Sequence, residues 1–114
     1  MTLVAVLGAG SWGTTLANLL ALKGDTVRIW AYEPEVIRAI NREHQNSVFL
    51  PDVPLHPGLR AYGDPGEAAA DVPVIVSAAP SHAVRSVLGP LRGVIKPDTL
   101  VVSATKGMRP TRSR

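Results

Sequence analysis

The chain has 114 residues, 46% of them hydrophobic and 18% charged, a balance typical of one folded domain and not of a disordered segment. It contains no cysteine, which excludes a disulfide scaffold, a cysteine nucleophile and a thiolate metal site. Residues 1–105 carry eight basic and nine acidic side chains, so the net charge of +3 comes from the last nine residues and does not indicate a nucleic-acid-binding face.

The uncharged segment 1–22 predicts a buried strand, a glycine turn and a helix. A signal peptide would begin with a positive region, which this segment lacks, and a membrane-spanning helix needs about 20 predominantly apolar residues. Three glycines and several hydroxyl side chains interrupt the apolar run. We therefore expect a soluble, cytoplasmic protein without membrane insertion.

Strands and helices are predicted to alternate from the start of the chain. Residues 2–7 form an uninterrupted apolar run, which is typical of a strand covered on both faces in a parallel sheet. Residues 11–23 predict a helix that ends at Gly24. Its apolar side chains recur at helical spacing: Trp12, Leu16, Leu19 and Leu20. Residues 25–30 predict a second strand, and a second helix begins at the Glu-Pro-Glu sequence 33–35 and extends to about residue 42.

The second half continues this alternation after a segment rich in proline and glycine. That segment predicts a loop, a short strand near residues 59–62 and a short helix within 64–70. Residues 72–77 predict the next buried strand, with its proline at the beginning because proline cannot donate a ladder hydrogen bond. A helix opening at residues 80–82 and a strand over 99–103 follow. The order predicts a single α/β domain of Rossmann type, with a doubly wound, mainly parallel sheet and helices on both faces.

The strongest functional signal is GAGSWG at residues 8–13, which has the spacing G-x-G-x-x-G. Gly8 permits a tight turn, Gly10 lets a pyrophosphate approach the backbone, and Gly13 lets helix and strand pack closely. The backbone N–H groups of Ser11 and Trp12 would lie at the positive end of the helix. Because the motif follows a buried strand and opens a helix, it predicts dinucleotide binding. A glycine turn without a ligand and a methyltransferase are the alternatives.

The end of the second strand leaves the choice between NAD and NADP open. NAD-specific proteins usually place an acid there, about 20 residues after the motif, whereas this chain reads Trp30-Ala31-Tyr32-Glu33. Glu33 precedes Pro34, and a role in starting the helix fits it better. No arginine is present among these residues to hold a 2′-phosphate. Tyr32 is a candidate to stack on the adenine or to bond the ribose.

Two further loops follow strands of the predicted sheet. Pro80, Ser81 and His82 come after the strand at 72–77 and would line the nicotinamide side, or serve as an ordinary helix start. Lys106 follows the last predicted strand and would offer a cation to a phosphate or a polarised oxygen, unless it lies in a solvated loop. The three histidines have no spacing typical of metal ligands, and no metal is expected.

Five segments together resemble a known family. They are GAGSWGTTLA at 8–17, IW at 29–30, NREHQNSVFLP at 41–51, AAPSH at 78–82 and SATKG at 103–107. In this order they are similar to the N-terminal, cofactor-binding part of bacterial NAD(P)-dependent glycerol-3-phosphate dehydrogenase, over residues 2–108. The resemblance implies reversible hydride transfer between dihydroxyacetone phosphate and sn-glycerol 3-phosphate for phospholipid synthesis, carried out by a full enzyme that is a homodimer.

The motif and the resemblance together predict an NAD(P) site. Its residues are Gly8, Gly10, Ser11, Trp12, Gly13, Tyr32, Phe49, Pro80 and Lys106. The resemblance implies that Lys106 also contacts the substrate. Tyr32 departs from the His or Arg that the family often has near the adenosine ribose, which weakens the expectation of a preference for NADP.

Members of the resembling family continue into a helical C-terminal domain that supplies the main catalytic lysine. We therefore expect residues 1–108 to be the cofactor-binding domain and residues 109–114 a truncated connection or tail. No catalytic residue is assigned in this chain. Alone it is expected to bind dinucleotide weakly or not at all and to turn over nothing, because hydride transfer needs both reactants held in near-attack geometry.

Two other functional classes remain open at this point. One is a stand-alone dinucleotide-sensing module that regulates a partner without chemistry. The other is the cofactor domain of a different two-domain dehydrogenase, such as a ketopantoate reductase or a 6-phosphogluconate dehydrogenase. The HxNxxFLP stretch within residues 44–51 and the TKG at residues 105–107 favour glycerol-3-phosphate dehydrogenase over another two-domain dehydrogenase.

Overall fold

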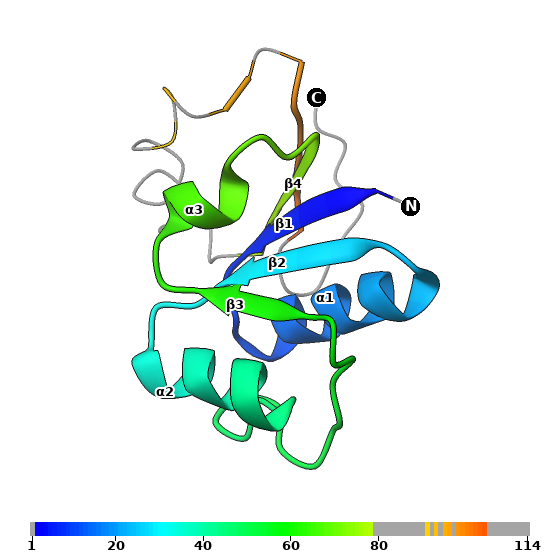
Figure 1. The fold of residues 1–114 in the computed structure, drawn as a ribbon, viewed down its shortest axis with the longest axis vertical. Coiled ribbons are helices and arrows are strands. Elements are labelled where there is room, and N and C mark those ends of the chain that lie inside the picture. The colour runs from blue at the N-terminus through cyan, green and yellow to red at the C-terminus, as the bar shows by residue number, and fades with distance from the viewer. Residues whose placement is uncertain (1, 79–90, 92, 94, 97, 105–114) are drawn as a thin grey trace.

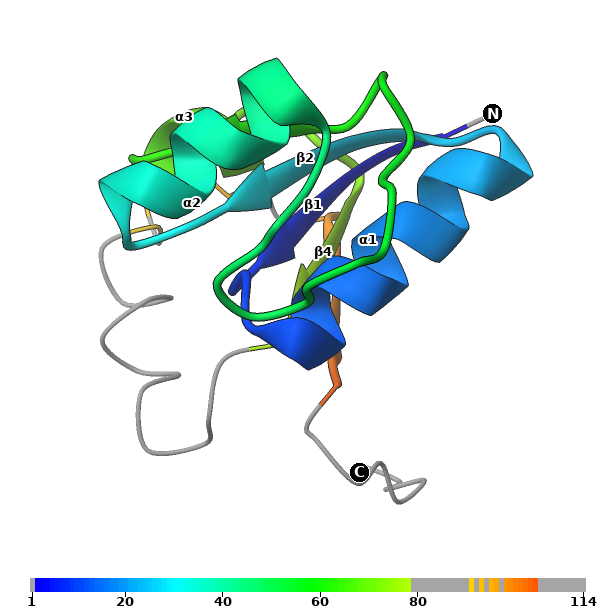
Figure 2. The same cartoon turned by 90° about the horizontal axis from the view of Figure 1, so that it is seen from below.

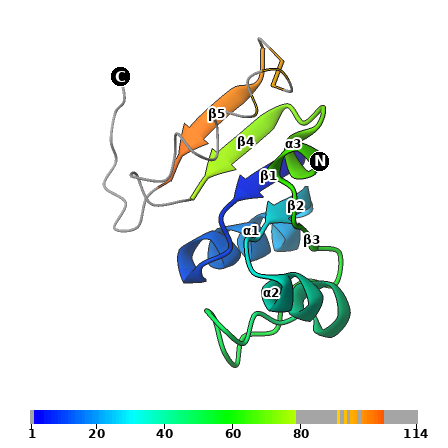
Figure 3. The same cartoon turned by 90° about the vertical axis from the view of Figure 1, so that its left-hand side faces the viewer.

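A five-stranded parallel sheet forms the centre of the protein, which we describe from a computed structural model. The structure describes residues 2–78, 91, 93, 95–96 and 98–104. The strands run side by side in the order β3-β2-β1-β4-β5 (Figure 3). They are β1 (Leu3–Leu7), β2 (Thr26–Trp30), β3 (Arg60–Tyr62), β4 (Val74–Ser77) and β5 (Leu100–Ser103). The predicted parallel, doubly wound α/β fold is confirmed.

Helices cover both faces of the sheet (Figure 1). On one face lie α1 (Ser11–Lys23) and α2 (Pro34–Arg38), which continues as one π-helical turn, η1 (Ala39–Glu43). On the other lies α3 (Pro65–Ala69). The prediction of a helix from Pro34 to about residue 42 is confirmed in extent, with its last turn widened to the π form. The short strand and short helix predicted in the middle are β3 and α3.

The central strand β1 is buried from both sides, as its unbroken apolar run predicts. Val4 and Val6 pack in the core under α1 and α2, whereas Ala5 and Leu7 pack in the core under α3. Since successive side chains of a strand point to opposite faces, one five-residue segment supplies both cores. Burial on both faces fits the central position of β1 in the sheet. The carboxyl end of β1 therefore lies between the carboxyl ends of β2 and β4.

The face that α1 buries is made of small residues. Gly13, Thr14, Ala17 and Ala21 are buried, while Leu19 is 57% exposed. The large side chains at helical spacing correctly predict a helix, but they do not form its main contact with the sheet. A helix packed closely on a sheet leaves no room for leucine at the contact, so small side chains occupy it.

Strand β5 has an open outer edge and exposed side chains among the described residues. Leu100, Val101 and Val102 are each at least 40% exposed, in contrast to their neighbours in the sheet core. The helix predicted to open at residues 80–82 lies outside the described residues, apart from Leu91, which is buried against α3. Among the helices that the structure describes, none has the length and apolar character needed to span a membrane.

Replacing Ile29 with valine is expected to lower the free energy of unfolding by about 1 kcal/mol. The Ile29 side chain is fully buried in β2, and the lost methylene leaves a small cavity in a close-packed core. Urea unfolding followed by circular dichroism measures the change. Leu19→Ala on the exposed side of α1 is the control and is expected to change stability by less than about 0.5 kcal/mol. Equal losses in the two variants would contradict the assigned burial.

Candidate functional site

The glycine turn lies where the carboxyl ends of β1 and β4 meet. The turn follows Leu7 directly and leads into α1, beside the end of β4 (Figure 2). The Ala78 N–H donates to the Leu7 carbonyl at 2.9 Å, so the two strand ends are joined by a hydrogen bond. From β1 the chain passes through α1 to β2 on one side of β1, and β4 lies on the other side. This reversal of strand order is the position at which open α/β sheets bind ligands.

Two of the three motif glycines are required by the backbone geometry. Gly8 has φ of 122°, a left-handed conformation that side chains with a Cβ rarely adopt. At Gly13 a Cβ would collide with the Gly8 carbonyl oxygen and lie 3.2 Å from the Ala78 Cβ. The roles predicted for these glycines, a tight turn and close helix–strand packing, therefore fit this turn.

The N-terminus of α1 is open and carries no acid. Gly10 is the N-cap residue, and a Cβ built there meets no atom of the described residues within 4 Å. The first bond of the helix runs from the Thr14 N–H to the Gly10 carbonyl at 2.9 Å, so the N–H groups of the three preceding residues have no partner within the helix. Among the described residues no side chain caps the helix, and no acid lies in its first turn. Such a terminus is suited to an anion.

The strand end next to this turn carries an exposed aromatic ring. Tyr32 follows β2, is 80% exposed and meets the Trp30 ring edge-on, with 6.5 Å between the ring centroids. Glu33 is the N-cap residue of α2, and its carbonyl accepts from the Val36 N–H at 3.0 Å. The helix-start role predicted for Glu33 is therefore confirmed. Tyr32 remains free to present its ring to a ligand at this edge.

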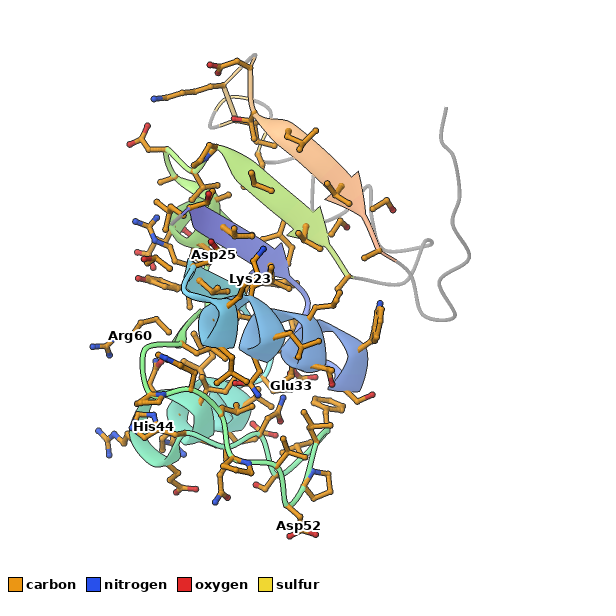
Figure 4. The ribbon with its side chains drawn as sticks, turned by 90° about the vertical axis from the view of Figure 1, so that its right-hand side faces the viewer. Lys23, Asp25, Glu33, His44, Asp52 and Arg60 are labelled. Carbon is orange, nitrogen blue, oxygen red and sulfur yellow. The ribbon has the colours of Figure 1, made fainter. Side chains whose placement is uncertain are left out.

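A turn from the segment after η1 lies against the glycine turn. The segment between His44 and Asp52 lies on the same side of the sheet as α1 (Figure 4). Within it, the Leu50 N–H donates to the Asn46 carbonyl at 2.7 Å and closes a turn that carries Phe49. Phe49 is 37% exposed. The structure thus brings the predicted residue Phe49 to the neighbourhood of the motif.

Two buried polar residues at this contact were not predicted to matter. Thr14 and Asn46 are fully buried, and the Asn46 Nδ2 donates to the Thr14 Oγ1 at 2.8 Å. Asn46 belongs to the HxNxxFLP stretch, which indicated the family but no contact for this residue. The local signal for a contact is polarity, since Thr14 lies on the otherwise apolar buried face of α1. A buried polar side chain needs a partner, which is the one hint that sequence could offer.

Some predicted site residues lie outside the described residues. These are Pro80, Ser81, His82 and Lys106. At the end of β4, Ser77 is almost fully buried, and its Oγ has no hydrogen-bond partner among the residues that the structure describes. The buried Trp12 Nε1 likewise has no partner within that part of the chain. Over the same residues, no three His, Asp or Glu side chains gather as a metal site would require.

A sequence model of the N-terminal part of NAD-dependent glycerol-3-phosphate dehydrogenases matches residues 3–114. The chain belongs to this family. It is 48% identical over 105 residues to glycerol-3-phosphate dehydrogenase [NAD(P)+] of Nitratidesulfovibrio vulgaris strain DP4, covering 92% of this chain and 32% of that protein. The same enzyme of Geobacter metallireducens is 48% identical over 92% of this chain and 31% of its own length.

A solved structure has the same fold as this chain. Glycerol-3-phosphate dehydrogenase from Coxiella burnetii superposes with a TM-score of 0.84 at 37% identity, over 92% of this chain and 32% of that one. The chain therefore spans about a third of the length of the relatives it matches. Membership of this family confirms the resemblance given by the five segments and disfavours a methyltransferase.

Proposed function

We propose that this chain is the dinucleotide-binding part of an NAD(P)-dependent oxidoreductase that interconverts dihydroxyacetone phosphate and sn-glycerol 3-phosphate. The observation that carries the proposal is the open N-terminus of α1, set at the end of the central strand and free of acids in its first turn. Its free N–H groups and the positive end of the helix dipole fit a pyrophosphate. The names of the relatives give glycerol 3-phosphate and NAD(P)+, and the resemblance implies dihydroxyacetone phosphate as the other reactant.

The proposed binding site has three parts. The glycine turn with Ser11 and Trp12 would hold the pyrophosphate, and Tyr32 at the end of β2 would contact the adenosine. Phe49 would line the cofactor from the turn that packs on the motif. Pro80 and Lys106 are proposed for the nicotinamide side from the resemblance, with Lys106 also contacting the substrate. When bound, the nicotinamide supplies or accepts the hydride, and the residues of this chain bind and orient the dinucleotide.

Residues 1–108 are proposed as the cofactor-binding domain. The main catalytic lysine and most substrate contacts would come from a C-terminal domain, like that of the family which the five segments resemble. The chain alone is expected to bind dinucleotide weakly or not at all. It is expected to catalyse nothing under this division, because the developing alkoxide would lack its charged partner. The homodimeric state of the full enzyme and its cytoplasmic location rest on the resemblance. NAD and NADP are both retained, because the acid beside Tyr32, Glu33, is the N-cap residue of α2 and no arginine stands among residues 30–33.

Titration of the chain with NADH and NADPH, followed by tryptophan fluorescence, tests the proposal. Trp12 lies in the first turn of α1, so a bound pyrophosphate is expected to change its emission in a saturable way. Trp12→Phe is the control that separates this change from that of Trp30. A response to S-adenosylmethionine and to neither dinucleotide would contradict the proposal. Turnover of dihydroxyacetone phosphate by the chain alone would contradict the proposed division between two domains.

A further inference from the structure

One buried amide joins the glycine turn to the turn that carries Phe49. The Asn46 Nδ2 donates to the Ala9 carbonyl at 2.9 Å and to the Thr14 Oγ1 at 2.8 Å. The Asn46 Oδ1 accepts from the Phe49 N–H at 3.2 Å. Both amide hydrogens and the amide oxygen are therefore used, and the side chain is fully buried. A buried amide with every group paired holds its surroundings in one arrangement.

The partners of this amide lie on both sides of the proposed phosphate site. Ala9 is the residue between the first two motif glycines, and Thr14 makes the first hydrogen bond of α1. The Thr14 Oγ1 also donates to the Ala9 carbonyl at 3.2 Å, which closes a triangle of three polar groups. On the far side, the Asn46 backbone closes the turn of Phe49 through Leu50. One side chain thus sets the position of two separate cofactor-facing segments.

We infer that Asn46 is a positioning residue for dinucleotide binding, because it holds the Phe49 turn in register with the glycine turn. The inference rests on the proposed function and deepens it. Asn46 does not touch the proposed pyrophosphate itself: its amide points at Ala9 and Thr14. Loss of the amide is expected to release the Phe49 turn and to misplace the Ala9 peptide, and so to weaken binding without removing any cofactor contact.

A second asparagine offers a matched control. The Asn41 Nδ2 donates to the Ala61 carbonyl at 3.0 Å, and its Oδ1 accepts from the Ala61 N–H at 2.8 Å. Its amide is paired through both nitrogen and oxygen like that of Asn46, although it is only partly buried, and it ties η1 to the edge strand β3, away from the glycine turn. Asn41→Ala therefore reports what loss of a comparable structural amide does to the chain.

The test compares Asn46→Ala with Asn41→Ala by nitrogen-15 NMR of the 114-residue chain. NADH is titrated to millimolar concentration, and exchange of the Phe49 amide hydrogen is followed in the free chain. Asn46→Ala is expected to weaken NADH binding by about fivefold, the effect of one net hydrogen bond, and to speed Phe49 exchange by at least about fivefold. Asn41→Ala is expected to leave both values within about twofold. Equal effects in the two variants overturn the inference.

A milder variant keeps the test decisive if Asn46→Ala does not fold. Thr14→Val keeps the side-chain volume and removes only the hydroxyl that accepts from Asn46, and it is expected to weaken NADH binding by about threefold. Unchanged affinity and unchanged Phe49 exchange in this variant overturn the inference. A wild-type chain that shows no shifts with millimolar NADH contradicts dinucleotide binding by these 114 residues alone, and Phe49 exchange in Asn46→Ala then decides by itself whether the amide holds the turn.

Discussion

Gly13→Ala is expected to lower the free energy of unfolding by about 3 kcal/mol, although alanine is the better helix former by about 1 kcal/mol. A Cβ at this position collides with the Gly8 carbonyl oxygen, which is backbone and cannot rotate away. To make room, α1 must move off the end of β1, and the contact with Ala78 must open. Since domains are stable by only about 5–15 kcal/mol, the loss is a large part of the total. Guanidinium unfolding measures it.

Gly10→Ala is the control for this prediction. A Cβ there meets nothing within 4 Å, so stability is expected to change by less than about 1 kcal/mol. The two alanine variants therefore separate helix packing from the approach of the ligand. Gly13→Ala is expected to unfold at a lower guanidinium concentration, whereas Gly10→Ala is expected to stay folded and to lose affinity for NADH. If Gly13→Ala is as stable as the unsubstituted chain, the close approach of α1 to the end of β1 is wrong.

Ser11→Asp is expected to change stability and dinucleotide binding in opposite directions. Ser11 is the first residue of α1 and is exposed, and the first turn contains no acid. A carboxylate there interacts favourably with the helix dipole and is expected to add about 0.3–1 kcal/mol to the free energy of unfolding. The same charge repels a pyrophosphate at the same N–H groups and is expected to weaken NADH binding by about tenfold or more.

Ser11→Asn is the matched control, because it adds a side chain of the same size without the charge. It is expected to leave NADH binding within about threefold of the unsubstituted chain. Chemical denaturation and NADH titration of the three chains measure both effects at one ionic strength, because salt screens the repulsion. A dinucleotide that binds Ser11→Asp as tightly as it binds Ser11→Asn would place the phosphates elsewhere.

Local patterns predicted the element that carries the site. The apolar run before Gly8, the glycine spacing and the cap at Gly24 were sufficient to predict β1, the turn and α1, because each is encoded within a few neighbouring residues. The helix-start role of Glu33 was predictable for the same reason, since Pro34 follows it directly. The cofactor-binding roles of the site residues stay predictions, and Pro80 and Lys106 lie outside the described residues.

The contacts between distant segments were not predictable in this way. Nothing in the spacing of α1 indicates that Ala17 and Ala21 meet the sheet while Leu19 faces solvent, because helix periodicity gives the faces but not which one is covered. The hydrogen-bond partner of a polar residue in an irregular loop cannot be predicted from the residues around it either. Asn46 reaches Thr14 across 32 positions of sequence and Ala9 across 37.

The sequence by itself determined the order of strands and helices, the glycine turn and the family, all of which depend on short-range patterns and motifs. Only the tertiary structure decided that small residues of α1 face the sheet and that Asn46 ties the Phe49 turn to the glycine turn. The physical reason is that a crossover connection brings such residues together through packing of whole elements. Packing of that kind depends on side-chain volume and on the pairing of buried polar groups. Neither produces a periodic pattern of residues from which the contact could be predicted.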